Sequence, residues 1–348
     1  MVTRQTTQTD LLCPTCAGQR LFDPDAGALK CDSCGAVHQL DGSGDDRAAL
    51  EIPYDPAQPQ PEPIAPQDIS THHCQTCGGD VVFAGPSVSE RCPYCDGPIV
   101  RHGNDTAYDT MAVVPFAVSR KTAIAQAHRW ASERLAAPNS LMVSVQNGRM
   151  AGLYAPFWTF DSKELVNYWA QQRKRSGKRT VFRRITGKMT TFFDDMLVPA
   201  STHVSPLIRD GILHRFEPAR LRPFRAGYLS GFAAELHHQT VAEGLKANAA
   251  DKDLLLRNRI RRHINRSGIV NIGYRTDTTG IHYRRILLPV WILHYQHGDT
   301  PMKIVVSGIN GRVFGERPFS LAKLLLLSAG LSVAALLLGV AWGVGGLP

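Results

Sequence analysis

Eight cysteines in two groups constrain the fold of this chain more than any other feature of its sequence. The groups are Cys13, Cys16, Cys31 and Cys34, followed by Cys74, Cys77, Cys92 and Cys95. Each group holds two Cys-x-x-Cys pairs separated by fourteen residues, and no cysteine is left over. Four thiolates suit the tetrahedral coordination of zinc, and a two-residue gap lets both thiolates of a pair reach one ion. The pattern predicts two zinc ribbons, each binding one structural Zn²⁺.

The residues between the cysteine pairs fit two β-hairpins. In the first group, residues 21–22 and 28–29 predict short strands on either side of a turn. In the second group, residues 81–84 and 88–90 flank a Gly-Pro turn. A glycine follows each pair closely, where a positive φ would turn backbone amides toward the sulfur atoms. These glycines are Gly18, Gly35, Gly78 and Gly97.

The expected role of the metal is structural. A ribbon of about forty residues buries too little surface to fold by itself, whereas zinc contributes about 10–16 kcal/mol in small zinc domains. Four protein ligands also leave no open position for a catalytic water. A redox Cys-x-x-Cys pair is the competing interpretation, and four pairs in two matched groups argue against it. Iron in place of zinc stays open, and His72 and His73 are interpreted as surface residues beside a complete site.

The sequence divides into five segments. Residues 1–42 and 71–103 are the predicted ribbons, and a proline-rich linker at 43–70 joins them. Such a linker is expected to be extended and to bury little. Residues 104–318 are long enough for a large core, and residues 319–346 are predicted to form a transmembrane helix as a tail anchor.

The C-terminal segment has the composition of a membrane span. Residues 324–348 contain no charged side chain, and about 20 helical residues cross a hydrocarbon core of about 30 Å. We expect residues 321–344 to anchor the chain, with a buried core helix as the alternative. Basic residues precede this segment and none follows it, which predicts cytoplasmic N-terminal domains at the bacterial inner membrane. That compartment is reducing, in agreement with cysteines that bind metal.

The central segment predicts an α+β body. A helix is expected at 119–136 and two more at 232–250 and 252–264. The strand-like stretches are 111–118, 153–160, 286–295 and 302–309, with a tight turn at Asn310-Gly311. Residues 153–158 resemble 287–291, since both place proline two residues before tryptophan. Related half-domains and coincidence both explain this similarity.

Basic residues form two clusters, and the whole chain carries a net charge of +9. One cluster lies between Arg173 and Arg184, and the other between Arg257 and Arg266. Contact with phosphates of nucleic acid or of anionic lipid headgroups is one interpretation, and a solvated surface is the other. Few aromatic residues lie between these basic residues, so no platform for stacking bases is expected. Asp194 and Asp195 are expected in a turn or loop rather than in a shared acid–base site.

Motifs of common enzyme classes are missing from the sequence. It has no G-x-x-x-x-G-K-[ST] phosphate loop, no H-E-x-x-H and no G-x-S-x-G. No catalytic residue and no organic cofactor is therefore predicted, and the chain is expected not to be an enzyme.

A family resemblance is carried by six stretches, namely 92–95, 137–141, 152–161, 193–201, 286–291 and 315–318. These stretches resemble the bacterial membrane-anchored TFIIB-type zinc-ribbon-containing proteins, often labelled primosomal protein N′-like or replication factor Y-like. The resemblance implies partners among SPFH-type membrane scaffolds and phage-shock-type stress proteins. The basic run 173–184 departs from what we expect in that family, and the helicase label lacks an ATP-binding motif here.

Together these features predict a non-enzymatic, membrane-tethered adaptor that makes protein–protein contacts at the inner membrane in envelope stress. The alternative is a nucleic-acid-binding protein that uses the ribbons and the basic clusters without helicase activity. Steeply salt-dependent DNA binding would support the alternative.

Overall fold

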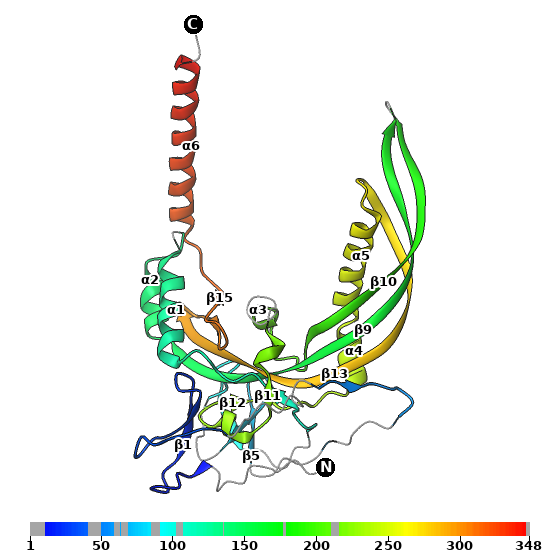
Figure 1. Cartoon of the computed structure of the whole chain (residues 1–348). Coiled ribbons are helices and arrows are strands. Elements are labelled where there is room, and N and C mark those ends of the chain that lie inside the picture. The colour runs from blue at the N-terminus through cyan, green and yellow to red at the C-terminus, as the bar shows by residue number, and fades with distance from the viewer. Residues whose placement is uncertain are drawn as a thin grey trace.

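The computed structural model describes residues 11–40, 50–58, 63, 69–84, 91–101, 107–134, 136–176, 179–209 and 216–345. These residues build a mixed α+β body, as the sequence predicts, with small β-structures around the cysteines. One long apolar helix, α6 (Leu321–Gly345), projects from the body (Figure 1).

The body is organised around two long antiparallel strands. These are β9 (Arg149–Ser176) and β13 (Ile269–His297), and β10 (Arg179–Pro199) pairs with the free edge of β9. The remaining strands of this sheet are β4 (Ile52–Pro53), β5 (Ile69–Cys74), β6 (Asp80–Ala84), β7 (Ile99–Arg101), β8 (Ala112–Val113), β11 (Arg222–Pro223), β12 (Ala233–Ala234), β14 (Thr300–Ser307) and β15 (Val313–Gly315).

The two similar sequence stretches are neighbours in this sheet. In the register of β9 and β13, Leu287 lies opposite Pro156 and Pro289 lies opposite Tyr154. The side chains of residues 153–158 and 286–288 are almost fully buried, which explains why both stretches read as continuous apolar strands. The strands predicted at 153–160 and 286–295 are therefore confirmed as parts of much longer ones.

Helices α1 (Arg120–Ser132) and α2 (Ser140–Gln146) cover one end of the sheet. Helix α1 begins after Ser119, as predicted, and buries Ala123, Ala127 and Trp130. It ends four residues before the predicted end at 136. Two short 3₁₀ turns and a one-turn helix lie elsewhere in the body: η4 (Pro218–Arg220), η5 (Ala226–Leu229) and α3 (Pro206–Ile208).

Two predicted elements differ from the structure. The helix expected at 232–250 is wrong in its first half, because β12 pairs with both β6 and β9 there. Helix α4 (Val241–Ala247) begins only after Thr240, which forms a capping box with Glu243. The strand expected at 111–118 is reduced to β8, since Pro115 has no N–H to continue a ladder.

The far ends of the long strands form a second, smaller packing unit, here called the arm. It consists of residues 162–176 of β9, 179–193 of β10, 269–279 of β13, and helix α5 (Ala249–Ile264), which was predicted from residue 252. A separate apolar core holds α5 on these strands, with Tyr168, Leu256 and Ile260 buried in it. The arm rises from the body on the same side as α6 (Figure 1).

Part of the linker is attached to the body. Its residues 52–53 are extended and exposed, as predicted, yet they pair with His282 and Tyr283 of β13. The backbone N–H of Tyr54 donates to the Ile281 carbonyl at 2.8 Å. Residues 43–49, 59–62 and 64–68 of the predicted linker lie outside the described residues.

Helix α6 is long and apolar enough to cross a membrane. Its stretch Leu321–Val340 has a mean hydropathy of 2.2 and is not buried by the body. At its base, the Lys323 ammonium donates to the Ala137 carbonyl at 2.8 Å and to Asn139 Oδ1 at 2.7 Å. Length and composition thus agree with the predicted span.

Candidate metal centres and the cleft between them

The first cysteine group is assembled by a small three-stranded sheet. Its strands are β1 (Arg20–Asp23), β2 (Ala28–Cys31) and β3 (Val37–His38), and β1 pairs with β2 as the sequence predicts. The Sγ atoms of Cys13 and Cys34 lie 3.7 Å apart, and those of Cys16 and Cys31 lie 3.5 Å apart. The hairpin therefore brings the two pairs into one group.

The second cysteine group is assembled by strands of the body sheet. Strand β5 leads into Cys74 and pairs with β6 and β7. The Sγ atoms of Cys74 and Cys95 lie 3.5 Å apart, and those of Cys77 and Cys92 lie 3.8 Å apart. The strand predicted at 81–84 is confirmed within β6, while the one predicted at 88–90 lies outside the described residues.

Both groups can hold a metal ion. Within each group, the four cysteine sulfur atoms all lie within 4.8 Å of one another. Zn–S bonds of about 2.3 Å in a tetrahedron place sulfur atoms about 3.8 Å apart. The sulfur–sulfur distances of 3.5–3.8 Å are consistent with zinc.

Only two of the four glycines take the conformation that the sequence predicts. Gly35 and Gly78 have φ of 73° and 74°, but Ala17 (φ 58°) and Asp96 (φ 65°) occupy the left-handed position in the other two turns. Gly18 and Gly97 serve close packing instead. A Cβ on Gly18 would lie 2.5 Å from Ser33 Oγ, and a Cβ on Gly97 would lie 2.2 Å from Thr76 Oγ1.

The thiols in each group compete for ionisation. Burial opposes ionisation of Cys13, yet the backbone amides of Thr15 and Cys16, with His38 and Cys34, lower its pKa to about 5. Burial likewise opposes ionisation of Cys74, while the amides after it lower its pKa to about 7. Neighbouring thiolates raise the pKa of Cys16 to about 12, although the Gly18 amide opposes this shift. A divalent cation would relieve this repulsion and let all four thiols ionise.

The sequence did not single out His38. Its Nε2 lies 3.7 Å from Cys13 Sγ, which places the imidazole beside the first group. The prediction that His72 lies on the surface is wrong, since it is 5% exposed and packs edge-on against Phe83. His72 lies two residues before the buried Cys74 in β5, so both side chains point to the buried face of that strand. His73 is partly exposed and its Nδ1 lies 2.6 Å from Asp80 Oδ1.

A buried carboxylate of the body binds the second ribbon. Glu235 is 4% exposed and accepts hydrogen bonds from the Tyr94 hydroxyl and, at 2.6 Å, from Ser201 Oγ. His203 lies 3.2 Å from the same carboxylate and 3.2 Å from the Cys77 carbonyl. The carboxylate raises the pKa of His203.

Two further side chains attach the second ribbon to the long strands. His294 of β13 donates from Nε2 to the Pro93 carbonyl at 2.8 Å. Arg149 at the start of β9 pairs with Asp96 and donates to the Cys92 carbonyl at 3.3 Å. The second ribbon is therefore continuous with the body rather than a separate module.

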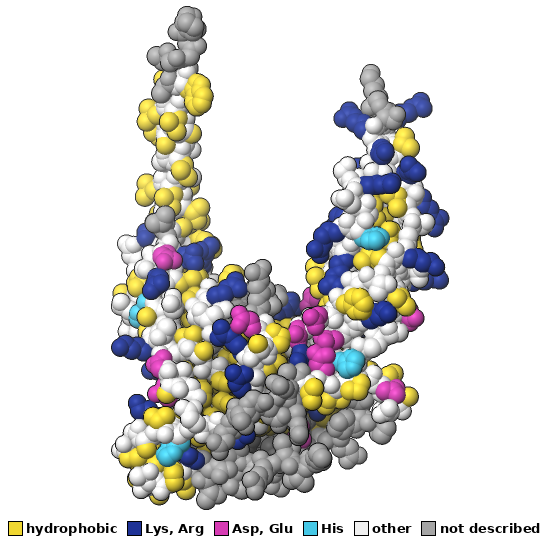
Figure 2. All heavy atoms as spheres, in the orientation of Figure 1, with side chains coloured by type: hydrophobic (Ala, Val, Ile, Leu, Met, Phe, Trp, Pro, Cys, Tyr) yellow, Lys and Arg dark blue, Asp and Glu magenta, His cyan; other side chains and the backbone are white. Residues whose placement is uncertain are grey.

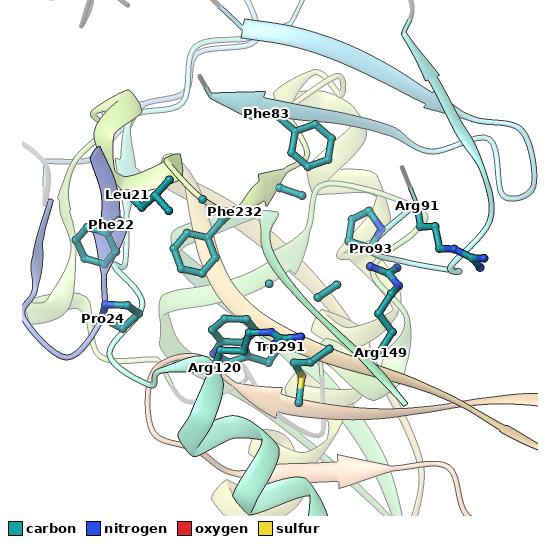
Figure 3. Close-up of a pocket in the computed structure, with 15 residues that line it drawn as sticks. Leu21, Phe22, Pro24, Phe83, Arg91, Pro93, Arg120, Arg149, Phe232 and Trp291 are labelled. Atoms are coloured by element: carbon teal, nitrogen blue, oxygen red, sulfur yellow. The ribbon is translucent and has the colours of Figure 1, made fainter. Parts of the chain in front are cut away.

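A cleft of about 510 Å³ opens between the two ribbons and the body. Phe232 and Trp291 of the body lie between the first ribbon's Phe22 and the second ribbon's Pro93 (Figure 3). Its lining also includes three arginines, Arg91, Arg120 and Arg149. The cleft thus combines an apolar floor with positive charge, and all three parts contribute to it.

The prediction for the acidic pair is wrong in one respect. Asp194 and Asp195 lie in β10 rather than in a turn, but at a bulge where Asp195 takes a φ of 49°. Carboxylate oxygens of Asp195, Asp161 and Glu51 lie within 4.8 Å of one another. The guanidinium of Arg284 pairs with Glu51 and Asp195 and supplies the cation of this group.

One known protein is similar to this chain along nearly its whole length. The chain is similar to the uncharacterized protein YdjG of Bacillus subtilis strain 168, with 24% identity over 335 residues, or 92% of this chain and 93% of that protein. The similarity therefore extends well beyond the cysteine groups. No protein-family model and no solved structure matches the chain.

Proposed function

We propose that this protein is a non-enzymatic, membrane-tethered adaptor that docks a partner protein in the cleft between its two zinc ribbons. The cleft carries this proposal, because residues from both ribbons and from the body line it together. A surface built from three parts exists only while both ribbons are folded and attached. In this proposal zinc fixes the shape of a docking surface and takes no part in chemistry.

The ligand sets agree with a structural metal. Each group offers four cysteine sulfurs, and four protein ligands complete a tetrahedral zinc site. The tether in this proposal is α6, and the domains that precede it lie at the cytoplasmic face of the bacterial inner membrane. SPFH-type and phage-shock-type membrane proteins are the partners that we expect from the family resemblance, and envelope stress is the expected setting.

The lining of the cleft indicates the chemistry of the partner segment. The nearly buried rings of Phe83, Phe232 and Trp291 line the cleft, and the exposed Arg120 lies beside Trp291 (Figure 3). Arg91 and Arg149 both pair with the single carboxylate of Asp96, so the three arginines of the cleft outnumber this carboxylate and leave a net positive charge. A segment with an apolar side chain next to a carboxylate fits this combination.

The proposal is tested by cross-linking from the rim of the cleft. Full-length protein carrying a photo-reactive amino acid at Pro24 is irradiated in membranes, extracted in mild detergent and analysed by mass spectrometry. We expect one membrane-associated protein to be captured in wild type and lost in Arg120→Glu. An acidic residue suits the first turn of a helix, so this substitution leaves α1 folded.

Lys121→Glu is the matched control, since Lys121 is exposed in the same first turn of α1 and does not line the cleft. Capture that survives Arg120→Glu, or that Lys121→Glu reduces equally, would contradict docking at the cleft.

A further inference from the structure

The positive charge of the chain is concentrated on the arm. Residues 165–193 and 254–276 contain fourteen Lys and Arg and no Asp or Glu. The whole chain has 39 Lys and Arg and 30 Asp and Glu, so the remainder holds 25 against 30 and is net −5. The two basic clusters of the sequence thus become one surface when α5 packs on the hairpin. Figure 2 shows dark-blue side chains over the upper arm.

Exposed apolar side chains lie among these charges. The register of β9 and β10 places Arg173 opposite Phe182 and Lys174 opposite Val181. Trp169 is 40% exposed, Phe182 55% and Phe192 62%. Few aromatic residues lie between the basic ones in the sequence, but cross-strand pairing places Phe182 beside Arg173. Cations beside exposed aromatic rings are typical of surfaces at the headgroup level of a membrane.

The position of the arm indicates whether its cations bind phosphates of lipid headgroups or of nucleic acid. The arm rises from the body on the side from which α6 projects (Figure 1). A basic residue near an anionic leaflet contributes about 1 kcal/mol to membrane attraction. We propose that the arm binds the anionic phospholipid headgroups of the membrane that α6 enters. The proposal requires α6 to span, but it does not depend on a partner in the cleft.

Charge also restricts how the arm lies. Side chains of Lys and Arg are too costly to place in the hydrocarbon core, so the arm lies along the headgroups. The body leaves α6 exposed beyond its base, where Lys323 bonds to Ala137 and Asn139. In this proposal these contacts open and residues 317–319 turn, so that the arm lies on the surface while α6 crosses the membrane. Single-stranded nucleic acid also fits cations with exposed rings, but the shared side with α6 favours the membrane.

The test compares hydrogen exchange of the arm in two bilayers. Full-length, zinc-loaded protein is placed in nanodiscs of phosphatidylcholine, or of an equal mixture of phosphatidylcholine and phosphatidylglycerol. We expect amide exchange in β10 of the arm to slow by at least about fivefold in the anionic discs, because each basic residue near such a surface contributes about 1 kcal/mol of attraction and several act together. High salt should remove this protection.

Two triple variants complete the experiment. Arg175→Glu with Arg179→Glu and Arg184→Glu should abolish the protection. Lys30→Glu with Arg225→Glu and Lys246→Glu should preserve it, since those cations are exposed on the first ribbon and the body, outside the arm. Equal exchange in both bilayers would overturn the proposal. So would protection that needs added single-stranded DNA or RNA, which would assign the arm to nucleic acid.

Discussion

The two cysteine groups share one spacing and differ in how they attach to the rest of the molecule. The first forms a sheet of its own, and its Cys16 and Cys34 are exposed. The second belongs to the body sheet, and none of its cysteines is exposed. The same local motif thus forms a separate small sheet that packs on the body core through Phe22 and Leu29 in one place, and part of the body sheet in the other. Surroundings, rather than ligand spacing, decide this difference.

The contacts of the first ribbon are fewer but specific. The Phe22 N–H donates to the Ser230 carbonyl at 3.0 Å, and its ring packs edge-on against Tyr228 with centroids 5.4 Å apart. Ser230 Oγ donates to the Arg20 carbonyl at 2.6 Å. These contacts close one wall of the cleft.

The largest expected difference between the two ribbons is in the effect of losing a metal site. We expect Cys31→Ser to remove one of two zinc ions and to leave the melting of the body unchanged. Cys92→Ser should also remove one ion, but it should destabilise the body, because zinc contributes on the order of 10 kcal/mol to the fold around it. Metal analysis and thermal denaturation followed by circular dichroism measure both effects.

The double variant Cys13→Ser with Cys74→Ser should retain no zinc. Equal melting temperatures of Cys31→Ser and Cys92→Ser would show that the two ribbons contribute equally to the stability of the body.

The buried carboxylate gives the next largest effect. Glu235→Ala leaves the Tyr94 hydroxyl without its acceptor, and we expect it to cost about 3 kcal/mol in unfolding free energy. Chemical denaturation measures this loss. Glu243→Ala, which removes only an exposed helix cap, should cost about 1 kcal/mol. Equal losses in the two variants would mean that Glu235 does not hold the second ribbon.

A smaller substitution loosens the first ribbon. Phe22→Leu keeps an apolar side chain but removes the contact with the Tyr228 ring, at a cost of about 1 kcal/mol. We expect faster hydrogen exchange in residues 20–31 and unchanged exchange in β9. A matching increase in β9 would show that the first ribbon is coupled to the body core.

The smallest effect concerns the linker between the ribbons. Burial, together with Asp161, raises the pKa of Glu51 to about 7. A raised carboxyl pKa stabilises the folded state below the unfolded pKa of about 4.5, and this stabilisation is lost as pH rises through 7. Exchange of residues 50–54, corrected for the intrinsic rate, should therefore increase between pH 6 and pH 8. Glu51→Gln should remove that dependence, and an unchanged dependence would assign it to another group.

Much of the organisation was predictable because it depends on local patterns. Cysteine spacing predicted both cysteine groups, and the hydropathy of the C-terminal segment predicted α6. Helical periodicity after the capping Ser119 predicted α1. Only the parts of β9 and β13 that lie in the body were predicted as strands, because those parts are continuously apolar. In the arm the same strands alternate apolar residues with polar residues on the open face, and they were not predicted there. Failures occurred where distant residues meet, as at β12, where pairing with β6 and β9 overrides local helix propensity.

The sequence by itself determined the two cysteine groups, the apolar helix and the excess of positive charge. Only the tertiary structure decided that Glu235 and His203 reach the second ribbon, that Arg284 meets the Asp195 bulge, and that two basic clusters share one arm. Cysteine groups and helices are encoded over a few residues, so residue spacing reveals them. The cleft and the arm join residues that are distant in the sequence, and their contacts exist only once β9 and β13 have paired.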